Sequence, residues 1–252
     1  MQKPVRLDKY LADAGCGTRS EVKIHIQKGK VTVDGECIRK PEFKVTDQEV
    51  CLDGKTVSQA KEFVYYLLHK PAGVISATTD RKEKTVMDLF PEEIRNGRRE
   101  LFPVGRLDKD TEGLLLITDD GALAHELLSP KKHVDKTYFA VVNGILGDDA
   151  IRVIKEGVDI GDREITLPAA LEVLNTGEDG NTEVLLTIQE GRFHQVKRMM
   201  KAVGCEVVYL KRITMGSLHL PSDLLKGMWR ELKDEEVFAL KNTLYTDGFP
   251  ML

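Results

Sequence analysis

Apolar residues at the start of the chain follow the spacing of a helix and then become ambiguous. Over residues 7–14 they recur at helical intervals, which predicts a short helix that ends at Gly15. Over 20–28 the apolar residues alternate as in a strand, although Ser20 is a suitable helix N-cap and Gly29 a suitable stop. A helix and a strand therefore both remain open for this segment.

Two β-branched runs, at 31–33 and 50–52, are each followed by the dipeptide Asp-Gly. This dipeptide favours a tight hairpin because both of its positions tolerate positive φ. The hairpins and helices together predict a compact first domain over residues 1–58.

After a polar stretch at 55–62 the pattern changes to longer apolar runs. The run at 63–68 has the length of a strand and precedes a Lys-Pro-Ala-Gly turn. Further strands are expected at 114–118, 137–142, 171–174, 183–188 and 206–210, and helices at 122–128, 148–156 and 193–203. Residues 78–100 are expected to form a charged surface loop with one short helix near 86–90.

Strands outnumber helices in this second part and do not alternate regularly with them, which disfavours a doubly wound parallel sheet. The predicted fold class is α+β, with a largely antiparallel mixed sheet flanked by helices. We expect this domain to span 62–242 and a C-terminal tail to cover 243–252. The longest aliphatic run, at 114–117, is far shorter than the roughly 20 residues of a membrane helix, so no membrane partner is expected.

The charge of the 252-residue chain is unevenly distributed. Ten basic and six acidic residues give 1–44 a charge of +4, which leaves −8 for the rest of a chain whose net charge is −4. A second basic cluster lies between 192 and 212. Because local patches decide whether a protein can bind a phosphate backbone, the clusters are candidate nucleic-acid contacts. The alternative is that both are solvated faces.

Motifs for cofactors and metals are not found in the sequence. The four cysteines form no CxxC pair and have no histidine at metal-binding spacing, so we expect reduced thiols and no structural metal. No P-loop, HExxH or GxSxG motif is present. We therefore expect any catalysis to need no cofactor. The chain begins without an apolar leader, which favours a cytoplasmic protein.

A polar loop between Gly105 and Gly113 directly precedes the aliphatic run at 114–117. Loops at strand edges often carry catalytic groups because a rigid sheet holds them in place. Asp108 in this loop is a candidate to stabilise positive charge that develops at a sugar carbon. The alternative is a carboxylate that stabilises a turn or a helix terminus.

Two further segments carry candidate functional groups. Basic residues from His194 to Lys201 share one face of a predicted helix. Three interpretations of this face are open. It is a solvated surface, it binds phosphate, or it places one cation beside a carboxylate. Tyr138 heads an apolar strand, where it is either a core residue or a ring that stacks on an extruded base.

Several segments together resemble the RsuA-like family of pseudouridine synthases. Gly-Arg-Leu-Asp at 105–108, with the Leu-Leu-Leu-Ile-Thr-Asp-Asp-Gly that follows, is similar to the family signature. Lys-Thr-Tyr at 136–138 and the segment 191–199 are similar to two further motifs, and Lys-Pro-Ala-Gly at 70–73 is similar to the first motif. Residues 6–35 resemble the S4 RNA-binding domain that precedes the catalytic domain in this family.

The resemblance implies an enzyme that isomerises uridine to pseudouridine in RNA without a cofactor. It implies that Asp108 is the catalytic carboxylate at the ribose and that Lys197 pairs with Asp108. Tyr138 would stack on the uracil and help to move a proton. Arg106 would fill the gap left by the flipped uridine, whose extrusion costs roughly a few kcal/mol. Whether Asp108 adds covalently or steers proton transfer stays open.

The resemblance also implies that the partner is ribosomal RNA, with the small subunit or its assembly intermediate favoured. We expect a monomer, but the sequence leaves the oligomeric state open, as it does the target uridine. The predicted RNA-binding residues are Arg6, Lys9, Arg19, Lys23 and Lys28 in the S4-like part, mostly toward phosphates, and Arg192, Gln195 and Arg198 in the second part.

Two other functions remain open. One is a non-catalytic RNA-binding or ribosome-assembly factor, although a scaffold gives no reason to place Asp108 between Arg106 and a sheet edge. The other is a glycosidase that releases the base. Hydrolysis by the usual route needs a second carboxylate, for which Asp110 and Glu112 are the nearest candidates in sequence.

Overall fold

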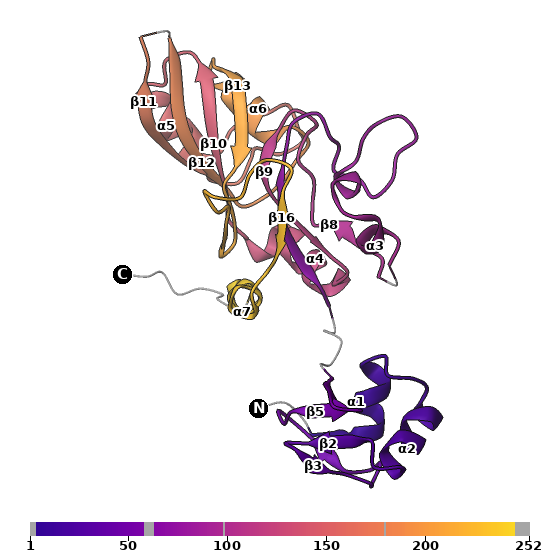
Figure 1. Cartoon of the computed structure of the whole chain (residues 1–252). Helices are drawn as coiled ribbons and strands as arrows, with labels where there is room; N and C mark the ends of the chain where they lie inside the picture. The colour runs from indigo at the N-terminus through magenta and orange to yellow at the C-terminus, as the bar shows by residue number, and fades with distance from the viewer. Residues whose placement is uncertain (1–3, 58–62, 98, 179, 245–252) are drawn as a thin grey trace. The chain divides into compact units, whose positions relative to one another are not determined.

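The computed structural model describes residues 4–57, 63–97, 99–178 and 180–244 of the chain. Its contacts divide the chain into two compact units, Met1–Glu62 and Phe63–Leu252 (Figure 1). Each unit has buried apolar residues of its own. In the described ranges, every helix is too short or too polar to cross a membrane.

The first unit packs two helices against short antiparallel strands. Its sheet has the order β3-β2-β5-β6, and a separate pair joins β1 to β4. The elements are β1 (Val5–Arg6), α1 (Leu7–Asp13), α2 (Arg19–Gln27), β2 (Val31–Val33), β3 (Glu36–Cys37), β4 (Lys44–Val45), β5 (Val50–Leu52) and β6 (Lys55–Thr56). Both predicted hairpins are confirmed, because the turn residues Asp34 and Asp53 have φ values of 48° and 50°.

The ambiguous segment at 20–28 is helical, as part of α2. Val22 and Ile26 are fully buried one helical turn apart, whereas Ile24 between them is 49% exposed. The N-cap is Thr18 rather than the predicted Ser20. Thr18 and Glu21 form a capping box, in which the Thr18 amide donates to the Glu21 carboxylate at 2.7 Å.

The second unit is built on an eight-stranded mixed sheet with the order β11-β12-β10-β13-β9-β7-β16, and β8 pairs with β9 beside this path. The strands are β7 (Tyr65–Lys70), β8 (Phe102–Pro103), β9 (Glu112–Thr118), β10 (Lys136–Asn143), β11 (Ala170–Thr176), β12 (Asn181–Ile188), β13 (Glu206–Arg212) and β16 (Trp229–Glu231), with a small hairpin of β14 (Thr214–Met215) and β15 (Leu218–His219). Only β9 and β13 pair in parallel among these described strands. The α+β class and the largely antiparallel sheet are therefore confirmed.

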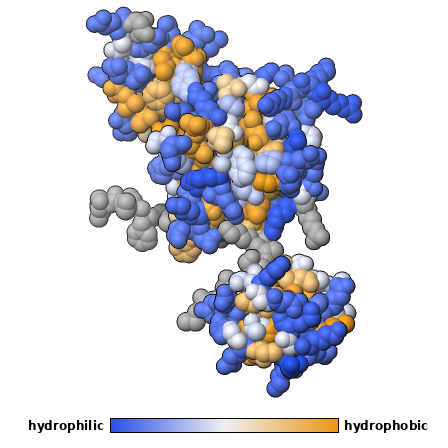
Figure 2. Space-filling view, viewed as in Figure 1, coloured by the Kyte–Doolittle hydropathy of each residue, from blue (hydrophilic) through white to orange (hydrophobic). Residues whose placement is uncertain are grey.

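Helices cover both faces of this sheet (Figure 1). They are η1 (Val86–Leu89), α3 (Glu92–Arg95), α4 (Gly121–Leu128), η2 (Pro130–Lys132), α5 (Asp148–Glu156), α6 (Gln195–Ala202) and α7 (Asp234–Thr243). The sequence analysis did not predict α7, whose last residue, Thr243, falls in the expected C-terminal tail. Residues 245–252 of that tail lie outside the described residues. The surface in view is mainly hydrophilic, with apolar side chains gathered at the end where β11 and β12 lie (Figure 2).

Strand β9 is central and buried along its whole length. Leu114 and Leu116 pack in a cluster with residues of α4 and α7, whereas Leu115 and Ile117 pack in a second cluster with residues of α6. A strand covered on both faces reads as a continuous apolar run, as this one does. The rigid strand β9 thus begins directly after the loop that carries Asp108.

Candidate active site

The loop between β8 and β9 is fixed to the body of the second unit on both sides of Asp108. The preceding residue, Leu107, is 5% exposed. Its amide donates to Ser76 Oγ at 3.0 Å, and the same hydroxyl donates to the Leu107 carbonyl at 2.8 Å. After Asp108, the Lys109 carbonyl accepts from the Gly73 amide at 2.8 Å. The backbone at Asp108 is therefore held by the turn that follows β7.

Lys70, at the end of β7, also fixes this loop, through hydrogen bonds to its backbone. Its side chain is fully buried. The ammonium donates to the carbonyls of Asp108 at 2.9 Å, Thr111 at 2.8 Å and Pro71 at 3.1 Å, with a longer contact to Lys109 at 3.4 Å. Burial lowers the pKa of Lys70 to about 8 against the opposing charges of nearby carboxylates. Sequence reasoning placed Lys70 in a turn and in the segment that resembles the family's first motif, but it did not predict these contacts, because three of the four carbonyls lie 38 to 41 residues away along the chain.

The Asp108 carboxylate lies beside two groups at the start of α6. Lys197 Nζ is 3.5 Å from Asp108 Oδ2, and His194 Nε2 is 3.5 Å from Asp108 Oδ1. The expected contact with Lys197 is present but shared, because Lys197 Nζ donates to both oxygens of Asp110 at 2.7 Å. This hydrogen bond and the lysine charge lower the pKa of Asp110.

Asp108 lines a pocket of about 560 Å³ together with Arg106 and Tyr138. This volume is within the usual range for small-ligand sites. Tyr138 is 7% exposed on β10, and its ring reaches the pocket from the sheet. Arg106 is exposed. The structure thus gathers three predicted site residues, from a loop and a strand, around one cavity.

Two aromatic rings stack at the same pocket, a contact that the sequence analysis did not predict, because it named His194 only as part of the basic face. The rings of Phe193 and His194 stack with their centroids 3.8 Å apart, and the Phe193 side chain is 72% exposed. Both residues line the pocket. Sequence reasoning placed them at the start of a helix, whereas α6 begins at Gln195 and His194 has a φ of 50°. The aromatic dipeptide before a basic helix was the available signal.

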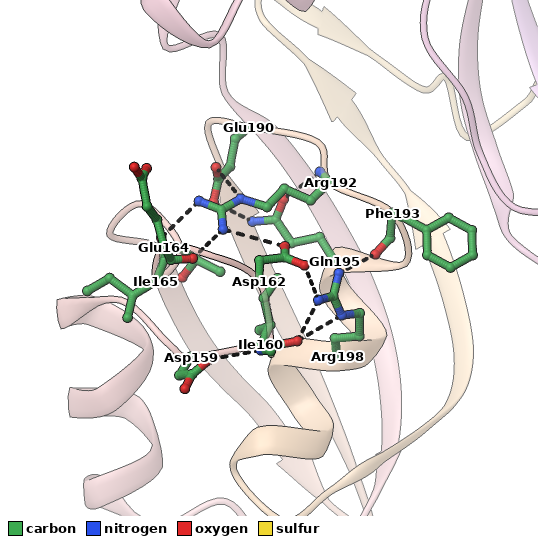
Figure 3. A network of polar contacts seen from close by, with 12 residues as sticks. Asp159, Ile160, Asp162, Glu164, Ile165, Glu190, Arg192, Phe193, Gln195 and Arg198 are labelled. Atoms are coloured by element: carbon green, nitrogen blue, oxygen red, sulfur yellow. Dashed lines mark hydrogen bonds and ion pairs between the residues drawn. The ribbon is translucent and has the colours of Figure 1, made fainter.

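Arg192, Gln195 and Arg198 are engaged with protein groups rather than standing free in solvent (Figure 3). Arg192 donates to the carbonyls of Glu164 at 2.6 Å and Ile165 at 2.8 Å. These contacts bind the segment after α5 to the start of α6.

Arg198 and Gln195 are also bound to neighbouring protein groups. Arg198 donates to the Ile160 carbonyl at 3.0 Å and pairs with Asp162. Gln195 is 4% exposed, and its amide donates to Glu190 at 2.9 Å. The expectation that these three residues bind RNA stays a prediction, and their contacts show that they hold local structure.

In the first unit, three of the predicted RNA-binding cations surround one buried carboxylate. Asp8 is 1% exposed and accepts two hydrogen bonds from Arg6, at 3.1 and 3.0 Å. Arg19 and Lys23 lie 4.0 Å from its oxygens. The hydrogen bond from Arg6 lowers the pKa of Asp8 below its usual value. Lys9 and Lys28 are exposed.

No group of histidine, cysteine and acidic residues in the described ranges has the make-up of a metal site. All four cysteines are free thiols.

Both units of the chain are similar to known proteins. A family model described as RNA pseudouridylate synthase matches residues 64–202, and a model of the S4 domain matches 5–51. An uncharacterised RNA pseudouridine synthase of Bacillus subtilis is 48% identical over 94% of this chain and 98% of that protein. The ribosomal small subunit pseudouridine synthase A of Escherichia coli is 39% identical over 94% of this chain and 100% of that protein. A crystal structure of a pseudouridylate synthase superposes with a TM-score of 0.65 at 35% identity, and covers 94% of this chain and 99% of that one.

The mixed-sheet domain with its S4 leader defines an RNA-modifying isomerase of the pseudouridine synthase class. Within that class, the chain belongs to the RsuA-like pseudouridine synthase family.

Proposed function

We propose that this enzyme isomerises one specific uridine of small-subunit ribosomal RNA to pseudouridine, with Asp108 as the catalytic carboxylate. The observation that carries the proposal is the pocket shared by Asp108, Tyr138 and Arg106, with the Lys197 ammonium 3.5 Å from the Asp108 carboxylate. The choice of ribosomal RNA rests on relatives named as ribosomal small subunit pseudouridine synthases. Such a substrate implies action in the cytoplasm, where ribosomes assemble in bacteria.

The isomerisation exchanges one bond to the ribose for another. The N1–C1′ bond breaks, the C5–C1′ bond forms, C5 loses its proton, and N1 regains one. Positive charge develops at C1′ while the base is detached, and a carboxylate at that carbon stabilises it. Two roles for Asp108 fit this position: covalent attack at the sugar, or steering of a proton transfer.

Tyr138 and Arg106 handle the extruded nucleotide. The buried Tyr138 ring at the pocket wall offers a face on which the uracil stacks. Arg106 is an exposed residue of the catalytic loop, where its long side chain can enter the gap left in the RNA. This insertion offsets part of the cost of extrusion, which is roughly a few kcal/mol.

RNA affinity is assigned mainly to the first domain, proposed to span 1–58. The side chains of three cations pair with the Asp8 carboxylate and remain about half exposed to solvent. They are Arg6, Arg19 and Lys23. Together with the exposed Lys9 and Lys28, they contact phosphates without reading sequence.

In the second domain, proposed to span 62–242, we assign a positioning role to three predicted RNA-binding residues. Arg192, Gln195 and Arg198 hold the start of α6, and with it Lys197, in place beside Asp108. Any contact that they make with RNA uses the N–H groups left over from these protein partners.

The test uses the full-length protein and an unmodified small-subunit ribosomal RNA transcript that carries tritium at C5 of uridine. Formation of the C5–C1′ bond releases the label, and mass spectrometry detects the carbon-linked product. Asp108→Asn should abolish release while RNA affinity stays close to that of the wild type. The matched control is Asp149→Asn, which removes an exposed carboxylate of α5 and should leave both quantities unchanged.

Other outcomes would favour the rival functions. Free uracil in place of the carbon-linked product would indicate a glycosidase. Tight RNA binding by the wild type without any tritium release from ribosomal RNA would indicate a binding factor for that RNA. Unchanged release by Asp108→Asn would overturn the role assigned to this residue.

A further inference from the structure

Two buried basic residues lie on the same sheet face as Tyr138. Lys136 precedes Tyr138 by two positions on β10, so both side chains point to one face of the sheet. Arg212 on β13 is the direct cross-strand partner of Tyr138 and therefore shares that face as well. Lys136, Tyr138 and Arg212 all line the pocket that contains Asp108.

Both cations are almost completely removed from solvent. Lys136 is 5% exposed and Arg212 is 2% exposed. Among the described residues, no carboxylate lies within ion-pair distance of either side chain. Burial and the neighbouring Arg212 charge lower the pKa of Lys136 to about 8, against a weaker opposing effect of Asp135. The positive charges of Lys136 and Arg212 are therefore neighbours, both buried, and neither forms an ion pair with a carboxylate.

Local hydrogen bonds use only part of the donors that these side chains carry. Lys136 Nζ donates to the Val134 carbonyl at 2.9 Å, which leaves further N–H groups of the ammonium. Arg212 Nε donates to the Leu114 carbonyl at 2.8 Å, whereas Arg212 Nη2 is buried without a hydrogen-bond partner among the described residues. An unpaired buried charge is costly, so a site that keeps two of them is adapted to receive an anion.

We infer that Lys136 and Arg212 form a binding subsite for a backbone phosphate directly adjacent to the flipped uridine. The inference rests on the proposed function, because the reacting uridine must lie at Asp108 and Tyr138 for its own phosphate to reach this face. A guanidinium and an ammonium together suit a phosphate, since the first offers a planar fork and the second a point charge. The single negative charge of the phosphodiester offsets part of the positive charge of the two cations, and its contacts fix the ribose relative to the Asp108 carboxylate. The phosphates on the 5′ and the 3′ side of the nucleotide have the same chemistry, and the experiment below determines which of the two binds.

The test is calorimetric titration of the full-length protein with uridine, uridine 5′-monophosphate and uridine 3′-monophosphate at neutral pH and constant ionic strength. One of the two monophosphates should bind on the order of tenfold more tightly than uridine, which is the usual effect of one charge-assisted contact. Lys136→Met should reduce this preference to nearly none. Lys136→Arg keeps the charge and should retain most of it.

Lys109→Met is the matched comparison, because Lys109 lines the same pocket but is exposed and paired with Glu83 at 2.6 Å. It should keep the monophosphate preference. An equal loss in Lys109→Met and Lys136→Met would show a general effect of charge and overturn the subsite. The same conclusion follows if neither monophosphate binds better than uridine to the wild type, or if the preference survives in Lys136→Met.

A measurement on the wild type alone covers the case in which Lys136→Met does not fold. Sulfate, exchanged for chloride at constant ionic strength, should weaken binding of the favoured monophosphate but not of uridine. Equal binding in the two salts would contradict the subsite. Activity on ribosomal RNA is measured separately: an active enzyme without a monophosphate preference rejects only the subsite, whereas a preference without pseudouridine formation rejects only the proposed function.

Discussion

The substitution Lys70→Met should lower the rate of the reaction strongly while it changes the stability of the fold only slightly. Methionine has a similar length and no charge, so it fills the buried space but donates no hydrogen bond. The carbonyls of Asp108, Thr111 and Pro71 would lose their shared donor. The loop that carries the catalytic carboxylate would then be free to shift, and a displacement of about 1 Å can cost roughly 10²-fold in rate.

The expected effect on stability is small because two large terms oppose each other. Three hydrogen bonds from a charged donor contribute roughly 4–5 kcal/mol at the low end of their range. Against this, the lowering of the Lys70 pKa from 10.5 to about 8 corresponds to about 3 kcal/mol of destabilisation at neutral pH. The unfolding free energy should therefore fall by only about 1–2 kcal/mol.

The pH dependence of stability gives an independent signature of the same buried charge. The pKa of Lys70 in the folded state is about 8, below the 10.5 of the unfolded chain. The unfolded state then binds more protons between these values, so the charge penalty is fully present below pH 8 and disappears as the pH rises toward 10.5. The wild type should therefore gain stability relative to Lys70→Met across this window.

Tritium release at saturating RNA measures turnover, and denaturant unfolding measures stability. Lys155→Met, the same substitution on the exposed face of α5, should change neither. Nearly wild-type turnover in a folded Lys70→Met protein would refute the positioning argument. A large loss of stability with unchanged turnover per folded molecule would assign Lys70 to the core alone.

Three further predictions concern RNA binding, acid stability and backbone packing. RNA affinity should fall steeply between low and moderate salt, because phosphate contacts release counterions, and a flat binding curve would contradict this. Asp8 has a pKa lowered by Arg6, so its contribution to stability is complete above its unfolded value of 3.8 and is lost as the pH falls through the lower folded value. Hydrogen exchange of α1 amides should show this loss in the wild type and not in Asp8→Asn. Gly113→Ala should cost about 2–4 kcal/mol of unfolding free energy in thermal or denaturant melts, since its φ is +111° and a Cβ would lie 2.2 Å from the Arg212 carbonyl oxygen. Gly227→Ala, with a φ of +82° and open space around it, should cost only about 1 kcal/mol.

Features governed by local rules could be predicted from the sequence. The Asp-Gly hairpins depend on the positive φ of two adjacent residues, and the helix α5 was predicted with its observed bounds. The alternation over 20–28 was less informative, because Ile24 is an exposed apolar residue that imitates the period of a strand. The gathering of Asp108, Tyr138 and Lys197 followed from the family resemblance rather than from spacing.

Features that depend on long-range pairing could not be predicted. Lys70 reaches the catalytic loop only because β7 pairs with β9. Arg212 reaches the pocket because β13 lies between β10 and β9, and the sequence showed it only as part of a basic cluster. The basic face of α6 was equally uninformative about Arg198, since the segment after α5 covers it and supplies Asp162. A charge pattern predicts a basic face but not the partner that occupies it.

The central claim is tested most directly by mapping pseudouridines chemically in small-subunit ribosomal RNA from cells with and without this protein. We expect one uridine position to lose its pseudouridine signal in cells that lack the protein. The wild-type protein should restore the signal on re-expression, and Asp108→Asn at the same abundance should not. An unchanged map without the protein, or full restoration by Asp108→Asn, would contradict the account.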